Sequence, residues 1–439
     1  MNTQELIIIG GGLAGSEAAW QAARLGVGVV LYEMRPARMT EAHKTQLFAE
    51  LVCSNSLRSR ELVTGPGLLK REMEIGGSLI MEAAKGAEVP AGSALAVDRK
   101  LFAGTVTDAL TGHPLIRIVR EEVSEIPASP CIIATGPLTT PSLSSEIRSL
   151  IGEDHLSFYD AISPIVDADS IDYAKVYSAS RYGKGGDDYL NCPMTPEEYD
   201  RFYDALREAD TVRVRSFEDD RVFEGCMPVE AMAARGRDTL RFGPLKPVGL
   251  VDPRTGKIPH AVVQLRMENR EKTAYNLVGF QTRLTHPYQE KIISMIPGLE
   301  HAEILRYGSI HRNTYMNAPE HLGQDLTLRE KENVYVAGQI TGVEGYIESA
   351  AMGFIAGVNA ARRMKGEAFI PPPGTSAHGS LVRFLIGKPT GAFQPSNIHF
   401  GLLPGDEQVQ RIRDKKQRRM LMAGRAIADW EDYIRGIFG

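Results

Sequence analysis

The segment that decides the fold lies near the N-terminus and reads Leu6-Ile7-Ile8-Ile9-Gly10-Gly11-Gly12-Leu13-Ala14-Gly15. Its four apolar residues predict a short buried strand, and the alanine-rich residues 16–25 that follow predict a helix. A second strand is predicted over residues 27–32 and ends at Glu33. The glycines at positions 10, 12 and 15 form the G-x-G-x-x-G pattern of a strand–helix–strand unit that binds a dinucleotide.

Each part of this unit has a predicted role in holding the dinucleotide. Gly10 allows the tight turn, Gly12 lets the backbone approach a pyrophosphate, and Gly15 lets the helix pack closely on the strand. The helix N-terminus attracts the phosphates. Glu33 stands where a carboxylate can accept a hydrogen bond from a ribose 2′-hydroxyl. The predicted cofactor site therefore contains Gly10, Gly11, Gly12, Leu13, Ala14, Gly15 and Glu33.

Two later segments favour FAD over NAD as the dinucleotide. Residues 131–136 form a short apolar strand that ends in Ala-Thr-Gly, and residues 333–338 form another strand that ends in Ala-Gly. The second of these precedes a helical run that starts near Gly345. With the N-terminal unit, the two segments resemble the three separated signatures of the glutathione-reductase-type FAD fold. This resemblance adds Gly136, Gly338, Gly342, Glu344 and Gly345 to the predicted cofactor site.

The middle of the chain differs in character from both ends. Residues 157–306 contain aromatic-rich, strand-like pieces, turn signals such as residues 252–256, and one helical pattern at 195–210. We therefore predict an α/β protein with a Rossmann-type, glutathione-reductase-like FAD-binding domain and an inserted α+β domain. The predicted boundaries are 1–156 for the first part of the FAD-binding domain, 157–306 for the insertion, and 307–439 for the second part with a C-terminal helical segment.

Composition and cysteine usage restrict the class of protein. The 439 residues are 43% apolar and 24% charged, as in an ordinary soluble protein. The N-terminus has no basic region before an apolar stretch, so we expect neither a secretory signal nor a membrane span. The cysteines Cys53, Cys131, Cys192 and Cys226 form no CxxC pair. This spacing predicts no zinc or other metal site and no dithiol redox motif, and it fits a reducing cytoplasm.

The charge pattern leaves the question of a nucleic-acid partner open. The net charge of −5 argues weakly against such a partner. Residues 411–419, however, hold six basic residues and a single acid, Asp414. This basic cluster is either a solvated helix face or a surface that contacts phosphates.

Several motifs resemble those of the GidA/TrmFO family of flavoproteins. They are GGGLAGSEAA (10–19), YEMRP (32–36), ELVCSNSL (50–57), LNCPM (190–194), FEGCMP (223–228), GPLKPVGL (243–250), HRNTY (311–315) and GVEGY (342–346). Within the family, the chain is most similar to the folate- and FAD-dependent tRNA (uracil-54-C5)-methyltransferases. The larger GidA members continue through a longer C-terminal helical domain, which we expect to be absent from a chain of this length.

The resemblance implies methylation of uracil C5 in tRNA. Methylenetetrahydrofolate would give the one-carbon unit, reduced FAD the hydride, and NADPH or NADH would recharge the flavin. Because uracil C5 is a poor nucleophile, a thiolate must first add to C6, and a base must later remove the C5 proton. The resemblance implies that Cys226 is the nucleophile and Cys53 the partner thiol, although the residues themselves leave the two assignments interchangeable.

The remaining candidate residues are less clear. The resemblance implies that His311 stacks on the pterin, whereas the residues alone favour a hydrogen-bonded structural histidine. Cys131 is expected to be structural because it lies in a predicted strand, and Cys192 is undecided. Alternative functions are the same chemistry on a ribosomal RNA uracil, a GidA-like modification of a wobble uridine, or flavin or RNA binding without catalysis.

Overall fold

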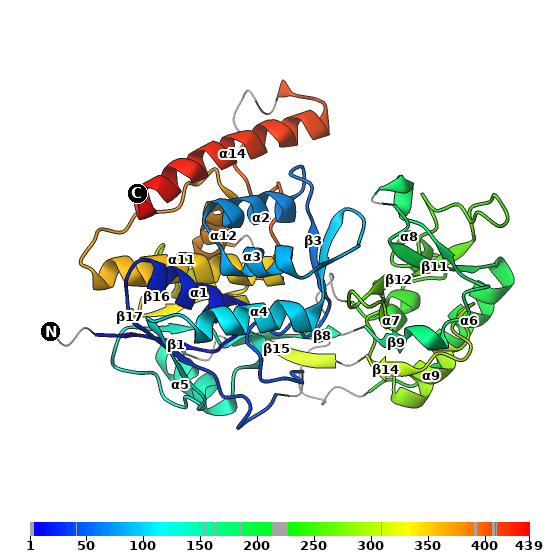
Figure 1. The fold of residues 1–439 in the computed structure, drawn as a ribbon, viewed down its shortest axis with the longest axis horizontal. Coiled ribbons are helices and arrows are strands. Elements are labelled where there is room, and N and C mark those ends of the chain that lie inside the picture. Colours follow the sequence, from blue (N-terminus) through cyan, green and yellow to red (C-terminus); the bar gives the residue numbers. More distant parts are fainter. Residues whose placement is uncertain are drawn as a thin grey trace.

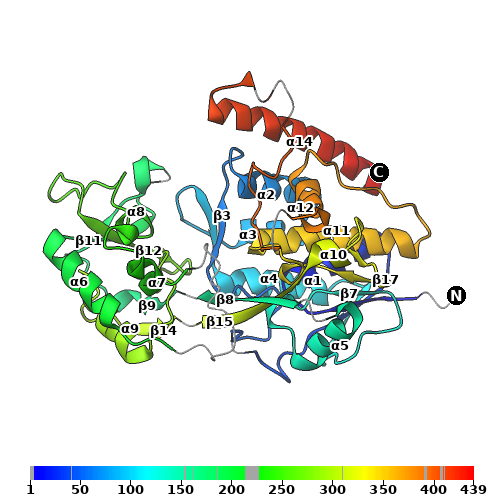
Figure 2. The same ribbon diagram turned by 180° about the vertical axis from the view of Figure 1, so that it is seen from behind.

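The protein was analysed as a computed structural model of its 439 residues. The structure describes residues 4–40, 42–152, 155–161, 163–184, 186–212, 227–308, 310–389, 393–405, 409 and 411–439. Of residues 155–161 and 310–314 only the backbone is described. Figures 1 and 2 show two lobes, with the N- and C-termini both on the larger one.

A six-stranded sheet forms the centre of the larger lobe. Its order is β16 (Thr327–Leu328), β17 (Lys331–Val336), β7 (Cys131–Ile133), β1 (Leu6–Ile9), β2 (Val29–Tyr32) and β6 (Ile116–Val119). All pairs are parallel except β16 with β17, and Ile8 pairs with Leu31 on one side and Ile132 on the other. The carboxyl ends of β1, β2, β7 and β17 therefore meet at one edge, where open α/β sheets bind ligands.

Helices cover both faces of this sheet. Figure 1 shows α5 (Pro141–Ile151) below the sheet, and α1 (Leu13–Arg24), α4 (Arg99–Thr111) and α11 (Tyr346–Met364) above it. A further layer holds α2 (Gly65–Ile75), α3 (Leu79–Gly86) and α12 (Ala377–Ile386), and α14 (Lys415–Phe438) lies across the top. The short helix α10 (Ala318–His321) contacts α12. No helix in the described part of the chain is both long and apolar enough to cross a membrane.

The contact between α1 and α11 is unusually close. A Cβ atom on Gly353 would lie 2.1 Å from the carbonyl oxygen of Ala14, and one on Gly357 would lie 2.5 Å from that of Ala18. Only glycine can occupy such positions without moving a backbone. The two glycines thereby fix the position of α1 against a helix from the far end of the chain.

The C-terminal helix is attached to the larger lobe by a buried polar cluster. Trp430 of α14 donates a hydrogen bond from Nε1 to the carbonyl oxygen of Glu72 in α2, at 2.6 Å. Its ring stacks on His378 of α12, with centroids 4.1 Å apart. The Glu72 carboxylate accepts hydrogen bonds from the backbone N–H groups of Ala377 and His378. The α14 helix therefore packs as a part of this lobe.

The smaller lobe is built on a second, antiparallel sheet. Its order is β10 (Tyr177–Ser178), β11 (Tyr189–Met194), β12 (Ala261–Met267), β13 (Ala274–Leu277), β9 (Ile165–Asp167) and β14 (Ile304–Arg306). It carries α6 (Pro196–Glu208), α7 (Val229–Ala234), α8 (Thr239–Phe242) and α9 (His286–Ile293), and it has a hydrophobic core of its own. The strands β8 (His155–Ala161) and β15 (Ile310–Met316) pair with each other beside the larger lobe (Figure 1).

The helical pattern predicted at 195–210 forms α6. Thr195 and Glu198 make a reciprocal capping box, in which the Thr195 side chain accepts from the Glu198 N–H and the Glu198 carboxylate from the Thr195 N–H. Tyr199, Phe202 and Leu206 follow at helical spacing and are buried. The helix therefore forms where both its start signal and its apolar face predict it.

The predicted fold class is confirmed by the parallel sheet with helices on both faces and by the mixed α+β lobe. The small sheet of β3 (Ser56–Ser59), β5 (Ala94–Val97) and β4 (Glu88–Val89) was not foreseen. The domain boundaries at 156 and 306 stay a prediction. Cys131 lies in β7 and is buried, which raises its thiol pKa to about 12. Cys192, which was undecided, is fully buried in β11, and burial raises its pKa as well.

Candidate cofactor and active site

A deep cleft opens where the parallel strands end. Its empty volume, counted out to solvent, is about 1050 Å³. Residues that follow the strands line it: Gly10 and Gly12 after β1, Glu33 after β2, Thr135 and Gly136 after β7, and Gly338 after β17. Tyr346 and Ser349 of α11 complete the wall on one side. The carboxyl ends of these four strands thus lie along one cleft.

The glycine-rich turn between β1 and α1 is shaped for a close ligand. Gly10 has a φ of +104°, and a Cβ there would lie 2.7 Å from the carbonyl oxygen of Ala134. A Cβ on Gly12 would meet nothing within 4 Å, so this residue faces open space. Gly12 is also the N-cap of α1 and brings no capping side chain. The first N–H groups of α1 can therefore bind phosphate oxygens, and the turn fits a pyrophosphate.

The predicted cofactor residues fall into three groups. Gly10, Gly12, Leu13, Ala14, Glu33, Gly136 and Gly338 line the cleft. Gly11 and Gly15 lie behind the turn, where a Cβ on Gly15 would come within 1.8 Å of the Gly10 carbonyl oxygen. Gly342, Glu344 and Gly345 lie in the loop that leads into α11 and do not line the cleft. The role of each residue toward the cofactor stays a prediction.

The carboxylate of Glu33 is held by a neighbouring arginine. It accepts hydrogen bonds from the backbone N–H groups of Gly11 and Arg35, both at 3.0 Å, and from Nε and Nη2 of Arg35, at 2.9 and 3.1 Å. These four bonds match the four lone pairs that a carboxylate offers. Burial opposes the charge of Glu33, but the bonds from Arg35 outweigh it, so its pKa is lowered.

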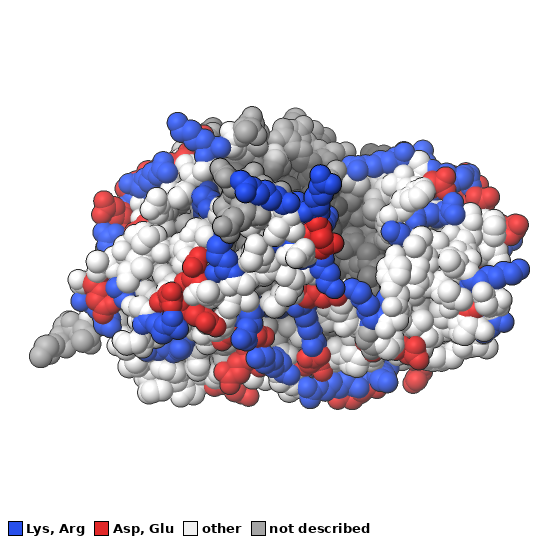
Figure 3. Space-filling model, turned by 90° about the horizontal axis from the view of Figure 1, so that it is seen from above, with Lys and Arg blue, Asp and Glu red and all other residues white. Residues whose placement is uncertain are grey.

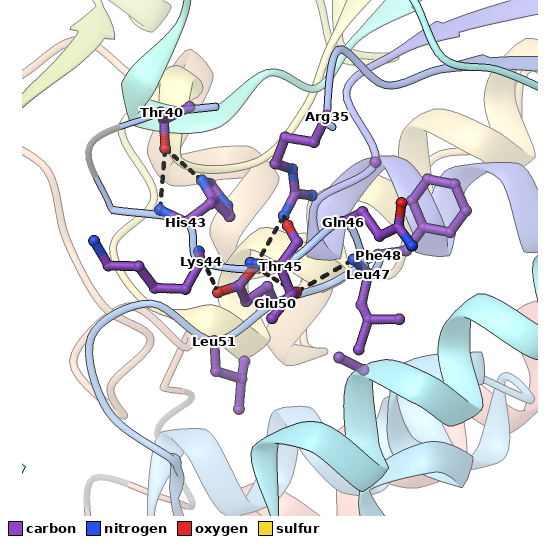
Figure 4. A network of polar contacts seen from close by, with 12 residues as sticks. Arg35, Thr40, His43, Lys44, Thr45, Gln46, Leu47, Phe48, Glu50 and Leu51 are labelled. Atoms are coloured by element: carbon purple, nitrogen blue, oxygen red, sulfur yellow. Dashed lines mark hydrogen bonds and ion pairs between the residues drawn. The ribbon is translucent and has the colours of Figure 1, made fainter. Parts of the chain in front are cut away.

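Arg35 also pairs with a second carboxylate, that of Glu50 (Figure 4). Its Nη1 lies 3.1 Å from Oε2 of Glu50 and 3.2 Å from the carbonyl oxygen of Thr45. Glu50 in turn accepts from the backbone N–H groups of Lys44 and Thr45. This network fixes the loop from residue 44 to 50 against the cleft. Arg35 belongs to the quoted YEMRP motif, but its role was missed.

The loop that carries Cys53 lies at the edge of the same cleft. Val52, which precedes Cys53 in the loop, and Tyr346, which is hydrogen-bonded to the loop, both line the cleft. The Tyr346 hydroxyl accepts hydrogen bonds from the N–H groups of Cys53 and Ser54, at 2.7 and 3.1 Å. Tyr346 is buried, which raises its pKa and keeps the hydroxyl neutral. The start of α11 therefore positions both the cofactor cleft and the Cys53 loop.

Guanidinium groups from three distant segments surround the Cys53 loop. The carbonyl oxygen of Cys53 accepts from Nη2 of Arg99, at 3.2 Å, and from Nη2 of Arg306, at 3.0 Å. Arg266 donates to Ser54 Oγ at 2.8 Å and to Asn55 Oδ1 at 2.8 Å. Guanidinium charge next to a cysteine favours the thiolate form.

The positive charge around this loop is only partly neutralised. Glu268 of β12 is the ion-pair partner of Arg99, at 2.6 Å. Burial and, after it, the nearby charge of Arg99 lower the pKa of Arg306 to about 10. Burial also lowers the pKa of Arg266. The three arginines were missed because nothing in the local sequence links residues 99, 266 and 306 to Cys53. Tyr346 was missed although it belongs to the quoted GVEGY motif.

The other two predicted catalytic or binding residues are only partly visible. Cys226 lies outside the described residues. The backbone of His311 lies in β15 opposite Asp160 of β8, but its side chain is outside the description. β15 contacts the short 3-10 helices Gly136–Leu138 and Gln339–Thr341, which contribute lining residues to the cleft. Within the described ranges, no group of three or more His, Cys, Asp or Glu side chains could hold a metal ion.

Comparison with known proteins places these features in a family. The family model "Glucose inhibited division protein A" matches residues 5–368. Curated relatives named methylenetetrahydrofolate–tRNA-(uracil-5-)-methyltransferase TrmFO include those of Geobacter sulfurreducens and Aquifex aeolicus. They are 57% and 54% identical, over 98% of this chain in both cases and 99% and 97% of theirs. GidA of Aquifex aeolicus superposes with a TM-score of 0.73, covering 100% of this chain and 74% of its own, at 17% identity, and so supports the fold alone.

Proposed function

The chain belongs to the glucose-inhibited division protein A family and to its TrmFO group, and from this premise we propose that it methylates C5 of a uracil in tRNA. The proposed target is position 54 in the T-loop, and the one-carbon donor is methylenetetrahydrofolate. The observation that carries the proposal is the Cys53 loop, held by Tyr346 and the arginines at the edge of the dinucleotide cleft.

FAD is the proposed cofactor of the cleft. The Gly10 turn and the uncapped start of α1 would hold its pyrophosphate, and Glu33, which lines the same cleft, would lie beside its ribose. Ser349 and Tyr346, at the start of α11, would contact its flavin end. When bound and reduced, FAD supplies a hydride. We propose NADPH or NADH as the source of the electrons that reduce it.

The two cysteines would perform the covalent and proton-transfer steps. The thiolate of Cys226 adds to C6 of uracil, and the electron pair of the C5–C6 bond moves into the carbonyl as an enolate. C5 then bonds to the methylene carbon of the folate. Loss of the C5 proton to the Cys53 thiolate releases tetrahydrofolate and leaves an exocyclic methylene group. Addition of a hydride to that carbon expels the Cys226 sulfur from C6 and yields the methyl group.

The arginines around Cys53 support its part in this sequence. A thiolate accepts a proton only if it is populated before the reaction, and neighbouring guanidinium groups favour that form. Arg99 and Arg306 bind the carbonyl oxygen of Cys53, and both also interact electrostatically with its thiol. Together with the family resemblance, this is the support for the proposal that Cys53 accepts the proton and Cys226 is the nucleophile.

The RNA must be bound by local positive charge, because the net charge is −5. The basic cluster of residues 411–419 surrounds the start of α14. There Arg413, Lys415 and Lys416 are exposed, whereas Arg419 donates to the carbonyl oxygen of Val63. Figure 3 shows Lys and Arg side chains on both lobes of the face seen from above. We propose the exposed members of the basic cluster as one contact to the tRNA backbone.

The test is incubation of the purified protein with labelled methylenetetrahydrofolate, NADPH and unmodified total RNA, followed by mapping of 5-methyluridine. Label at position 54 of tRNA is expected. Cys53→Ala and Cys226→Ala should each abolish transfer while FAD stays bound. Label confined to ribosomal RNA would refute the target, and label derived from S-adenosylmethionine would refute the chemistry.

A further inference from the structure

The smaller lobe carries an open hollow with no role in the proposed chemistry. Its empty volume, counted out to solvent, is about 1170 Å³. It is lined by apolar, small, polar and charged residues of the segment 227–243, namely Met227, Met232, Arg235, Gly236, Arg237, Asp238, Thr239, Phe242 and Gly243. Met227 directly follows Cys226 in the sequence. The hollow is therefore connected to the proposed nucleophile by a single peptide bond.

Phe242 gives the hollow an exposed aromatic ring. It is 81% exposed, the highest value among the large apolar side chains of the described residues. The backbone below the ring is firmly held, because Leu240 is fully buried and Arg241 donates to the carbonyl oxygen of His260 at 3.0 Å. Arg241 also pairs with Asp238 at 2.6 Å. The exposed ring of Phe242 is therefore carried by a firmly held backbone.

The hollow combines guanidinium groups with the exposed ring of Phe242. Arg237 is held in place by Asp200 and Asp204, at 2.5 and 2.6 Å, and lies over the ring of Tyr203. Arg235 contributes a second guanidinium group, and Asp238, the acidic lining residue, is paired with Arg241. An exposed aromatic ring next to guanidinium groups is the combination with which proteins bind unstacked nucleotides.

We infer that this hollow, named here the Phe242 hollow, is a subsite for an unstacked nucleobase of the substrate RNA, which stacks on Phe242. This inference rests on the proposed function, because an enzyme that modifies a base must take that base out of its stack and so disturbs its neighbours. The subsite would take a loop nucleotide that flanks the target uracil, with its phosphate toward Arg235. The subsite would bind a base by stacking on its ring face and not by hydrogen bonds to its edge.

The test uses Phe242→Ala, Phe242→Trp and a matched control, Phe369→Ala. Phe369 is also exposed, at 39%, but lies between α11 and α12 of the other lobe. Binding of a T-arm stem-loop RNA is measured by titration at several salt concentrations. Since stacking on an aromatic ring supplies much of the affinity for an unstacked base, Phe242→Ala should raise the Kd about 5- to 150-fold. Phe242→Trp and Phe369→Ala should bind like the unchanged protein.

Two further measurements separate stacking from other causes. The salt dependence of the Kd should keep its slope in Phe242→Ala, because no phosphate contact is lost. With 2-aminopurine at one loop position at a time, the unchanged protein and Phe242→Trp should quench fluorescence at one position, and Phe242→Ala should not. FAD content and flavin reduction by NADPH should be equal in all variants.

The outcomes distinguish the inference from the proposed function. Equal Kd values and equal fluorescence for the unchanged protein and Phe242→Ala would overturn the inference, even where methyl transfer is normal. The inference would also be overturned if the only effect of Phe242→Ala were a loss of self-association, measured by sedimentation. That result would show that the ring contacts a second copy of the chain. Phe242-dependent stacking in a protein that transfers no methyl group would leave the inference standing and refute the proposed function.

Discussion

Gly353→Ala tests whether the crossing of α1 and α11 sets the shape of the cofactor cleft. At a helix position free of close contacts, this change would stabilise the helix by about 1 kcal/mol, because alanine has a higher helix propensity than glycine. Here the new Cβ would lie 2.1 Å from the carbonyl oxygen of Ala14, and 2.7 Å from both its carbonyl carbon and its Cα. All three atoms belong to the backbone, so no side-chain rotation can relieve the clash.

The clash should outweigh the gain in propensity. To reach normal contact distance, α1 and α11 must separate by roughly 1 Å. Overpacking of this kind costs about 1–3 kcal/mol, so we expect a net loss of up to about 2 kcal/mol. Because Ala14 also lines the cleft, the shift moves the first turn of α1, and the affinity for FAD should fall about tenfold, which corresponds to 1.4 kcal/mol.

The assay is urea unfolding of the apoprotein together with FAD titration. Gly424→Ala is the matched control, since Gly424 lies in the interior of α14 and a Cβ there would meet nothing within 4 Å. This control should gain about 0.5–1 kcal/mol and bind FAD normally. If Gly353→Ala is as stable as Gly424→Ala and keeps its FAD affinity, the packing argument is refuted.

Three further predictions concern charged residues. Glu33→Gln should destabilise the protein by about 2 kcal/mol at pH 7, because Arg35 loses one of its two carboxylate partners and keeps Glu50. Since the pKa of Glu33 is lowered in the folded protein, this difference in unfolding free energy should vanish as the pH falls through the folded-state pKa. Burial lowers the pKa of Lys70 from 10.5 to about 7, so between these values the unfolded chain holds a proton that the folded protein does not. The unfolding free energy should therefore rise from pH 7 to pH 10 by an amount on the order of 4 kcal/mol. Lys70→Met should remove this rise. Arg413→Glu, Lys416→Glu and Arg418→Glu together should weaken tRNA binding and flatten its salt dependence without changing FAD content; an unchanged slope would show that the basic cluster is only a solvated helix face.

The sequence was most informative where the interacting residues lie close together along the chain. The Gly10–Gly15 turn, the α6 capping box at Thr195 and the strand at Cys131 could all be predicted, because each depends on a pattern of a few adjacent residues. The fold class followed from the order of such patterns. The cofactor segments were recognised partly from their spacing and partly from family resemblance.

The environment of Cys53 could not be predicted in the same way. Its arginines come from α4, β12 and β14, and no periodicity links these segments to the loop at residue 53. The ion pair of Glu33 with Arg35 joins residues only two positions apart, but the sequence does not show that the arginine side chain turns back onto the carboxylate. This arrangement depends on the burial of Arg35, which is a property of the folded protein.

The partnership of α1 with α11 has a consequence for synthesis of the chain on the ribosome. The buried face of α1 is complete when Arg24 has been made, but its partner begins only at Tyr346. At about 5–20 residues per second, the intervening segment takes roughly 15–60 s to translate. During that interval α11 has not been synthesised, so α1 lacks the helix on which it packs, and β7 lacks its neighbouring strand β17. The finished cleft, and with it tight capture of a cofactor, therefore arises only near the end of translation, after the whole smaller lobe has been made.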